Sequence, residues 1–123
     1  LLLLVFSGGC VSIDIDYSTG RHARVNHVVL CWLKDPDDKA VRQQIVEASE
    51  GFRNIPGVLD VRIGKALPSA RTIVDDSFDI GIVVVCRDAE ALQEYLDHPQ
   101  HAAAARTLIR PAARKILVYD IVE

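Results

Sequence analysis

Residues 25–34 read VNHVVLCWLK, an almost uninterrupted apolar run rich in strand-forming residues. Successive side chains of a strand point to opposite faces of its sheet. Both faces of this strand are therefore apolar. One face carries His27, Val29, Cys31 and Leu33, and the other carries Val28, Leu30 and Trp32. A strand that is apolar on both faces indicates a central position in a sheet that is covered on both sides.

The segment after this strand has the pattern of an amphipathic helix. Asp35 is a suitable N-cap and Pro36 a suitable first helical residue, so we expect the helix to begin there. Apolar residues then recur at steps of three and four, which places them on one helical face. They are Val41, Ile45, Ala48, Phe52 and Ile55. Pro56-Gly57 predicts a turn after the helix.

Two more strands follow this turn. Leu59, Val61 and Ile63 alternate with polar residues, which predicts a half-buried strand. Residues 67–77 contain Pro, Ser, Thr and paired Asp, and they predict a loop. The run from Phe78 to Cys86 is nearly all apolar, so it indicates a second strand that is covered on both faces.

The stretch QEYLDHPQH, residues 93–101, contains a phenol and two imidazoles where a helix must break. Asp88 is expected to cap this helix, which runs through Leu96. The residue before a proline is driven out of the helical conformation, so the helix should end near His98. His101 then opens a second helical run over residues 102–109.

Pro111 is expected to end that run, and residues 115–122 predict the last strand. The resulting order is β-α-β-β-α-β, the α+β ferredoxin-like arrangement. Its central strands are the first and the third, which here are the two that are apolar on both faces. In this topology the two central strands run antiparallel.

Two of the three cysteines, Cys31 and Cys86, lie in these central strands. Their positions predict an offset of four or five residues, which at ~3.3 Å per residue separates them by more than about 10 Å. A disulfide requires α-carbons within about 7 Å of each other. We therefore expect two small buried hydrophobic side chains and no disulfide.

The composition bounds the class of protein. The 123 residues are enough for one domain, and half of them are hydrophobic, as in a packed globular core. The net charge of −3 argues against a nucleic-acid partner, which requires a concentrated basic surface. One basic group stands near the predicted end of the second helical run. It comprises Arg106, Arg110, Arg114 and Lys115, and we interpret it as a solvated helix end instead of an anion site.

The first residues have the pattern of an export signal. Residues 1–9 are read as a signal-peptide remnant, in which an apolar run precedes Ser7-Gly8-Gly9. Cys10 then resembles the lipidated cysteine of a bacterial lipoprotein, and residues 10–24 form a lipidated cysteine and tether. We expect export to the bacterial cell envelope and a lipid anchor in the outer membrane. Ordinary cleavage after Gly9 remains the alternative.

Three groups of residues resemble the stress-responsive A/B barrel, or Dabb, family. They are Asn26-His27-Val28-Val29-Leu30 with Trp32-Leu33-Lys34, then Ile55-Pro56-Gly57-Val58, and finally Tyr95-Leu96-Asp97-His98-Pro99-Gln100-His101. The resemblance covers the domain of residues 25–123. It implies a homodimer, in which two ferredoxin-like protomers pair sheet against sheet as a dimeric α+β barrel. Such pairing would cover the second apolar sheet face.

The resemblance also implies site residues. Some plant members are polyketide cyclases that work by aldol condensation, without a required cofactor, and their pattern gives His101 an acid–base role and Tyr95 an assisting role. Imidazole titrates near 6.5 and can remove a proton next to a carbonyl, while a phenol can hold the enolate oxygen. The pattern places His27 in the ligand pocket, and we add Val29, Cys31 and His98 to that pocket.

Each of these residues also has a structural interpretation. Tyr95 could be a core residue, His98 could end a helix, and His101 could cap the next one. Some relatives hold Mg²⁺ with backbone carbonyls, which would here belong to Phe52, Ile55 and Val58. Two histidines three residues apart make a weak metal site on their own.

Three functions remain open. The first is a small-molecule barrel of unassigned role that binds an apolar or aromatic ligand. The second is a cofactor-independent cyclase or lyase that uses His101 and Tyr95. The third, and least favoured, is a haem-binding or oxidising barrel in which His27, His98 or His101 would bind the iron. Whether the protein is an enzyme is left open by the sequence.

Overall fold

The computed structural model describes residues 23–123, so the predicted signal remnant and Cys10 lie outside the described residues, as does the tether up to residue 22. The elements in chain order are β1 (Val25–Leu33), α1 (Lys39–Glu50), η2 (Gly51–Asn54), β2 (Val58–Gly64), β3 (Ile80–Cys86), α2 (Ala89–Asp97), α3 (Pro99–Ala104), η3 (Ala105–Ile109), α4 (Arg110–Ala112) and β4 (Ala113–Val122). No helix among these is long and apolar enough to cross a membrane.

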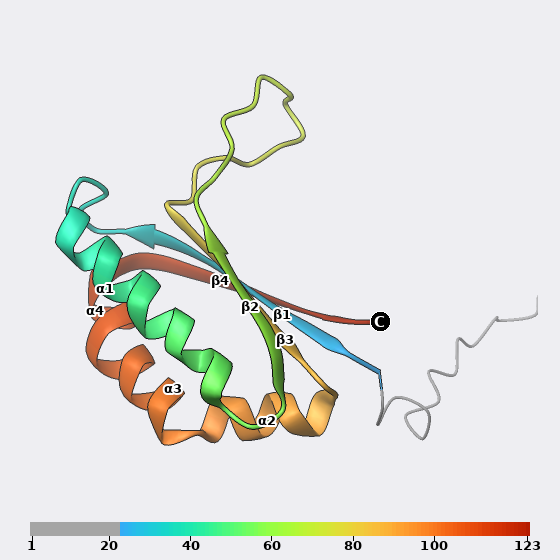
Figure 1. The fold of residues 1–123 in the computed structure, drawn as a ribbon. Helices are drawn as coiled ribbons and strands as arrows, with labels where there is room; N and C mark the ends of the chain where they lie inside the picture. Colours follow the sequence, from blue (N-terminus) through green and yellow to red (C-terminus); the bar gives the residue numbers. More distant parts are fainter. Residues whose placement is uncertain (1–22) are drawn as a thin grey trace, which may run out of the picture.

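The four strands form one antiparallel sheet in the order β2-β3-β1-β4. The predicted ferredoxin-like fold is therefore confirmed, and β1 and β3 occupy its centre. The helices lie on one side of the sheet, and the loop between β2 and β3 projects away from them (Figure 1). Cys31 pairs with Ile80, and Cys86 pairs with Val25. The cysteines are thus further out of register than predicted, and both thiols are free and buried.

Helix α1 begins later than predicted. Asp38, not Asp35, is its N-cap, and the Asp38 carboxylate accepts a hydrogen bond from the amide of Val41 at 3.0 Å. Asp35 instead accepts from the amide of Asp37 and so closes a turn before the helix. Aspartate is a favoured capping residue, so the sequence alone did not distinguish Asp35 from Asp38. After η2 the chain turns at Gly57, whose φ of +85° requires glycine.

The break predicted at His98 is confirmed. Asp88 caps α2 by accepting from the amide of Ala91 at 2.8 Å, and His98 is extended with ψ of 133°. His98 also caps α3, because its Nδ1 accepts from the amide of Gln100. Helix α3 begins at Pro99, so His101 lies in its first turns and does not open it.

Contrary to the prediction, the chain does not leave the helical conformation at Pro111. Pro111 lies within α4, and this helix directly follows the π-helical segment η3. Proline has no N–H and cannot complete the ordinary helical hydrogen bond, and a wider π turn accommodates that loss. The last strand consequently starts at Ala113, two residues before its predicted start.

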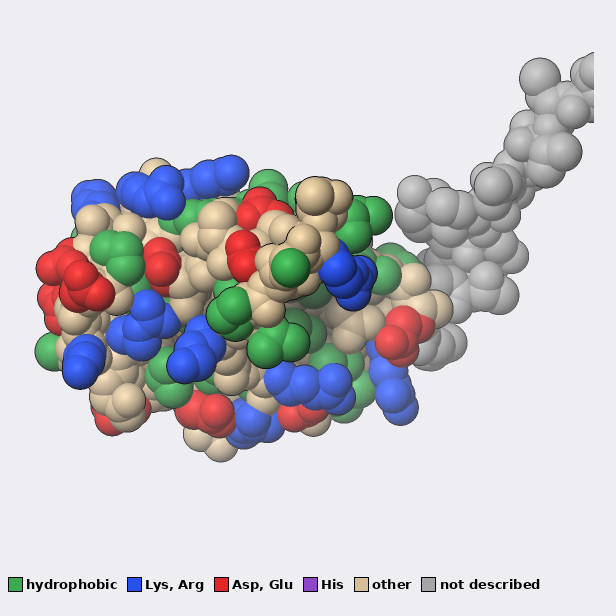
Figure 2. All heavy atoms as spheres, turned by 90° about the horizontal axis from the view of Figure 1, so that it is seen from above, with side chains coloured by type: hydrophobic (Ala, Val, Ile, Leu, Met, Phe, Trp, Pro, Cys, Tyr) green, Lys and Arg blue, Asp and Glu red, His purple; other side chains and the backbone are tan. Residues whose placement is uncertain are grey.

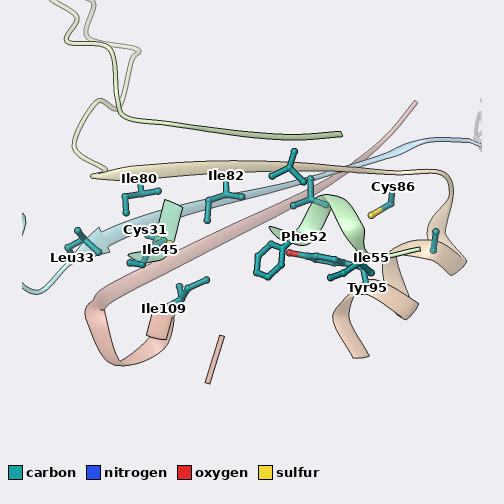
Figure 3. Close-up of a cluster of buried hydrophobic side chains, with 13 residues drawn as sticks. Cys31, Leu33, Ile45, Phe52, Ile55, Ile80, Ile82, Cys86, Tyr95 and Ile109 are labelled. Carbon is teal, nitrogen blue, oxygen red and sulfur yellow. The ribbon is translucent and has the colours of Figure 1, made fainter. Parts of the chain in front are cut away.

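The core lies between the sheet and the helices. Tyr95 and Phe52 lie side by side in it, with the hydroxyl end of Tyr95 directed toward Phe52 (Figure 3). The predicted apolar face of α1 and η2 contributes three buried side chains: Ile45, Phe52 and Ile55. Leu59 departs from its predicted half-buried position. A register shift between Val58 and Asp60 leaves it exposed.

The sheet face opposite the helices is apolar and partly open to solvent. Its apolar members are Val28, Leu30, Trp32, Val83, Val85, Leu117, Tyr119 and Ile121, and the register also places Asn26, Asp60, Arg62 and Lys115 on this face. Tyr119 and Ile121 are 53% and 54% exposed. Trp32 is buried because the root of the β2–β3 loop packs on it: its Nε1 donates to Ser77 at 2.9 Å. Figure 2 shows hydrophobic side chains among charged ones on the side from which this loop projects.

Candidate functional site

A cavity of about 170 Å³ lies between the helix-facing side of the sheet and the helices. His27 and Val29 reach it from β1, Tyr95 from α2 and His101 from α3. The predicted chain break at His98-Pro99 makes this possible, because α2 and α3 can then approach the sheet at different angles. The cavity therefore brings together polar rings from distant parts of the sequence, His27 on the first strand and His101 on the third helix.

The cavity has a buried floor and an exposed mouth. Phe52, Ile82 and Tyr95 are at most 2% exposed and form the floor. Ile116 and Val118 of the edge strand β4 also line the cavity, yet they are 38% and 43% exposed. Large apolar side chains that remain this exposed mark the side on which the cavity opens to solvent.

Tyr95 is the centre of the polar cluster. Its ring centroid lies 4.4 Å from that of His101 and 5.7 Å from that of His27. Phe52 packs edge-on against both Tyr95 and His101, at 5.6 Å in each case. Burial raises the pKa of the Tyr95 phenol, and the neighbouring Cys86 thiol adds to the increase. Tyr95 consequently stays protonated at neutral pH and remains a hydrogen-bond donor.

His101 is held in one tautomer. Its Nδ1 lies 3.1 Å from the carbonyl oxygen of Leu96, which can only accept, so Nδ1 carries the hydrogen and donates. In the neutral ring, Nε2 then has a free lone pair. Burial lowers the pKa of His101, the bond to Leu96 opposes this, and the charges of His27 and Arg110 lower it further. His101 is therefore a neutral base at neutral pH.

His27 is held in the same way by a residue that the sequence reasoning missed. Its Nδ1 lies 2.6 Å from Oδ1 of Asp120, directly opposite on β4. His27 is only 5% exposed, whereas the Asp120 side chain is about half exposed. A carboxylate on Nδ1 fixes the tautomer of an imidazole and leaves Nε2 for other partners. The available signal was one acidic residue on the apolar, helix-facing side of the last strand.

The remaining predicted pocket residues divide into two groups. Val29 lines the cavity with His27. Cys31 lies two residues further along β1, where it is fully buried in the core beyond the cavity. His98 is not part of the cavity either, because its ring turns back to cap α3. The strand pattern predicted the face of Cys31 correctly but could not predict where along the strand the cavity ends.

The backbone carbonyls predicted to hold Mg²⁺ lie in the turn after η2. Those of Phe52 and Ile55 already accept hydrogen bonds, from the amides of Ile55 and Val58 respectively, each at 3.1 Å. The carboxylate of Asp60 in β2 is bound by Arg53 and Arg62. Residues 23–123 contain no cluster of three acidic, histidine or cysteine side chains that could hold a metal. A carbonyl oxygen has two lone pairs, so one that accepts a single hydrogen bond keeps the capacity to bind a cation, and the Mg²⁺ site stays a prediction.

Comparison with known proteins identifies the family. The model of the stress responsive A/B barrel domain, Dabb, matches residues 25–123. The chain belongs to the Dabb family. This confirms the family resemblance of the sequence. No curated protein matches the chain.

Solved structures agree with this membership. A Dabb family protein with a ferredoxin-like fold from Mesorhizobium loti is 24% identical, with a TM-score of 0.68 over 82% of this chain and 97% of that one. A dimeric ferredoxin-like protein of unknown function from Thermobifida fusca is 19% identical, with a TM-score of 0.68 over 84% of this chain and 93% of that one. A hydroxynitrile lyase from Passiflora edulis is 20% identical, with a TM-score of 0.72 over 83% of this chain and 94% of that one. At these identities the likeness concerns the fold.

Proposed function

We propose that this Dabb protein binds a small apolar or aromatic molecule in the cavity and contacts it through His27, Tyr95 and His101. One observation carries the proposal: both imidazole rings lie within 5.7 Å of the Tyr95 ring, and all three line one cavity with otherwise mainly apolar walls. A few convergent polar groups in an apolar pocket are typical of a small-molecule site.

The size of the cavity restricts the ligand. Pockets for drug-sized ligands have volumes of about 300–1,000 Å³. An apolar cavity of about 150 Å³ holds benzene. The cavity here, about 170 Å³, therefore suits a compound with one ring. Haem has four pyrrole rings and would require the helices to move apart, so the size favours the small ligand.

A second candidate function is an aldol-type carbon–carbon lyase without a cofactor. The observation that favours it is that a partner fixes Nδ1 of His101 and of His27, while Nε2 of each ring has no hydrogen-bond partner among residues 23–123. In such a step Nε2 takes the hydroxyl proton, and the O–H electron pair forms the carbonyl. The carbon–carbon bond breaks, and its electron pair leaves with the departing carbon, which then takes up a proton. Tyr95 can donate a hydrogen bond to the developing charge. The fold of the hydroxynitrile lyase supports this candidate.

The proposal includes a homodimer formed through the sheet face opposite the helices. Structures of similar fold from Thermobifida fusca and Bacteroides fragilis are described as dimeric. The apolar residues of that face, with Tyr119 and Ile121 half exposed, offer a surface that a second protomer would bury.

The proposal also keeps the export and lipid anchor predicted from residues 1–10. Cys10→Ala should release the protein from membranes into the soluble fraction, because the acyl chains would be lost. Membrane association that survives this substitution would contradict the anchor.

Ligand binding can be tested with single-ring compounds titrated into the protein by calorimetry. His101→Ala should weaken binding by about tenfold or more, since it removes one of the polar groups of the pocket. His98→Ala is the matched control, because His98 lies three residues away on the same helical break but outside the cavity. Equal losses in both variants, or no loss in His101→Ala, would contradict the site.

A further inference from the structure

We infer that the ligand carries a carboxylate, and that Arg110 binds this anion at the mouth of the cavity. The inference rests on the proposed ligand-binding function and adds the chemical class of the ligand. It assigns a binding role to a residue that sequence reasoning placed at a solvated helix end.

Arg110 differs from the other three members of that basic group. It is exposed and lines the cavity beside Ile109, Ile116 and Val118, whereas Arg106, Arg114 and Lys115 do not line it. Lys115 in fact lies on the opposite side of the sheet, 4.4 Å above the ring of Trp32. The basic group of the sequence is therefore not one surface. Of its four members, Arg110 is the one that a bound ligand would meet.

The guanidinium of Arg110 has no partner among residues 23–123. Its side chain forms no hydrogen bond or salt bridge with any of them. Arg53 and Arg62 bind carboxylates, and Arg42 donates to the backbone carbonyl of Asp79. The side chains of Arg71, Arg106 and Arg114 have no such partner among residues 23–123, but these three residues do not line the cavity. An arginine left without a partner at the edge of an apolar cavity retains its full capacity to bind an anion in a bidentate manner.

The backbone at Arg110 is also unusual. Residues Ala105–Ile109 form the π-helical segment η3, and Arg110 comes directly after it. A π turn contains an extra residue and rotates the next residues relative to a regular helix, and such turns are frequent at functional sites. The rotation accompanies the placement of both Ile109 and Arg110 at the cavity.

The charges around the cavity favour an anion. The charge of Arg110 reaches the interior, since it contributes to the lowered pKa of His101, after the larger effect of burial. No acidic residue among residues 23–123 lines the cavity, and the nearby Asp120 is already bound by His27. Apolar walls weaken the screening of such a charge. A carboxylate at the mouth would thus meet one positive charge without an opposing carboxylate on the wall.

Volume and charge together define the class of ligand. A cavity for one ring, with an arginine at its opening, fits a small aromatic carboxylate whose ring enters toward Phe52 and Tyr95. Benzoate and benzyl alcohol are suitable probes, because they share the ring and differ in the charged group.

The test compares these two probes by calorimetry at neutral pH. The wild-type protein should bind benzoate about tenfold more tightly than benzyl alcohol, since one charge-assisted pair is added. Arg110→Gln should remove this preference and leave the affinity for benzyl alcohol unchanged. Arg114→Gln, which alters an exposed arginine four residues away that does not line the cavity, should keep the preference.

The outcomes separate this inference from the function on which it rests. Equal affinity of the wild type for both probes, or a preference that survives Arg110→Gln, would overturn the role of Arg110 and leave the pocket intact. If the wild type bound neither probe, the proposal of a pocket for one-ring ligands would fail, and the inference with it.

Discussion

The two faces of the sheet are both largely apolar, but they differ in what covers them. The helix-facing side is covered by its own chain, and a cavity left there contains His27, Tyr95 and His101. The opposite face carries apolar residues that end in half-exposed Tyr119 and Ile121. Within residues 23–123, the root of the β2–β3 loop covers part of this face.

The two faces of the sheet are therefore suited to different roles: the helix-facing side to ligand binding and the opposite face to contact with another protomer. The polar rings lie in the cavity on the helix-facing side, and each histidine there has a fixed tautomer. The open face presents mainly aliphatic area, which is suited to contact with another apolar surface. Substitutions on the covered face should therefore change stability and ligand binding, whereas substitutions on the open face should change assembly.

The largest effect is expected from Phe52→Ala on the covered face. Phe52 is 1% exposed and packs against the rings of both Tyr95 and His101. Its loss should cost about 3–5 kcal/mol in the free energy of unfolding, because a large cavity is left in the core. Urea denaturation measures this cost. A cost below about 1 kcal/mol would mean that the covered face is loosely packed.

Val28→Asp should change assembly on the open face. Val28 lies between Val83 and Tyr119 in the register, so a carboxylate there would be buried without a partner in the proposed dimer. The dimer should dissociate about 100-fold more readily. Val122→Asp is the control, since Val122 is exposed on the helix-facing side of β4. Sedimentation that detects a monomeric wild type, or an unchanged dimer in Val28→Asp, would contradict the proposed interface.

Asp120→Asn should produce a smaller effect that is confined to the cavity. The amide keeps the shape of the side chain but no longer fixes the hydrogen on Nδ1 of His27. Stability should fall by about 1 kcal/mol, because one charge-assisted hydrogen bond is weakened at a half-exposed site. Dimer dissociation should be unchanged. A change in dimer dissociation here would show that the two faces are coupled.

The smallest expected effect is the pH dependence contributed by His101. Burial lowers the pKa of His101 in the folded protein, so the unfolded chain takes up this proton at higher pH. The stability it contributes is present above the unfolded pKa near 6.5 and is lost as the pH falls through the folded pKa. His101→Gln should therefore show a smaller decrease in Tm between pH 7 and pH 5 than the wild type. An equal decrease would place the titrating group elsewhere.

Much of the fold was predictable because local signals and topology agree. The two strands that are apolar on both faces, the cap at Asp88 and the break at His98 each rest on a short-range rule, and all are confirmed. The exact register was not predictable. The bulge that exposes Leu59 depends on how β2 pairs with β3, and no local pattern predicted the π turn before Pro111.

The candidate site was also predictable only in part. The family resemblance assigned His27, Tyr95 and His101 to one pocket before the structure was known. The role of Asp120 could not be predicted, since its contact with His27 depends on the β1–β4 register. The sequence did not distinguish Arg110 from the rest of its basic group, whereas the structure places Arg110 and Lys115 on opposite sides of the sheet.

The most direct test of the central claim is a titration of the histidine side-chain NMR signals with benzyl alcohol. The His27 and His101 ring signals should shift together, with one common Kd. The His98 signal should stay unchanged, because that ring caps α3 outside the cavity. Separate Kd values for His27 and His101, or a shift at His98 alone, would contradict a single ligand site built from these rings.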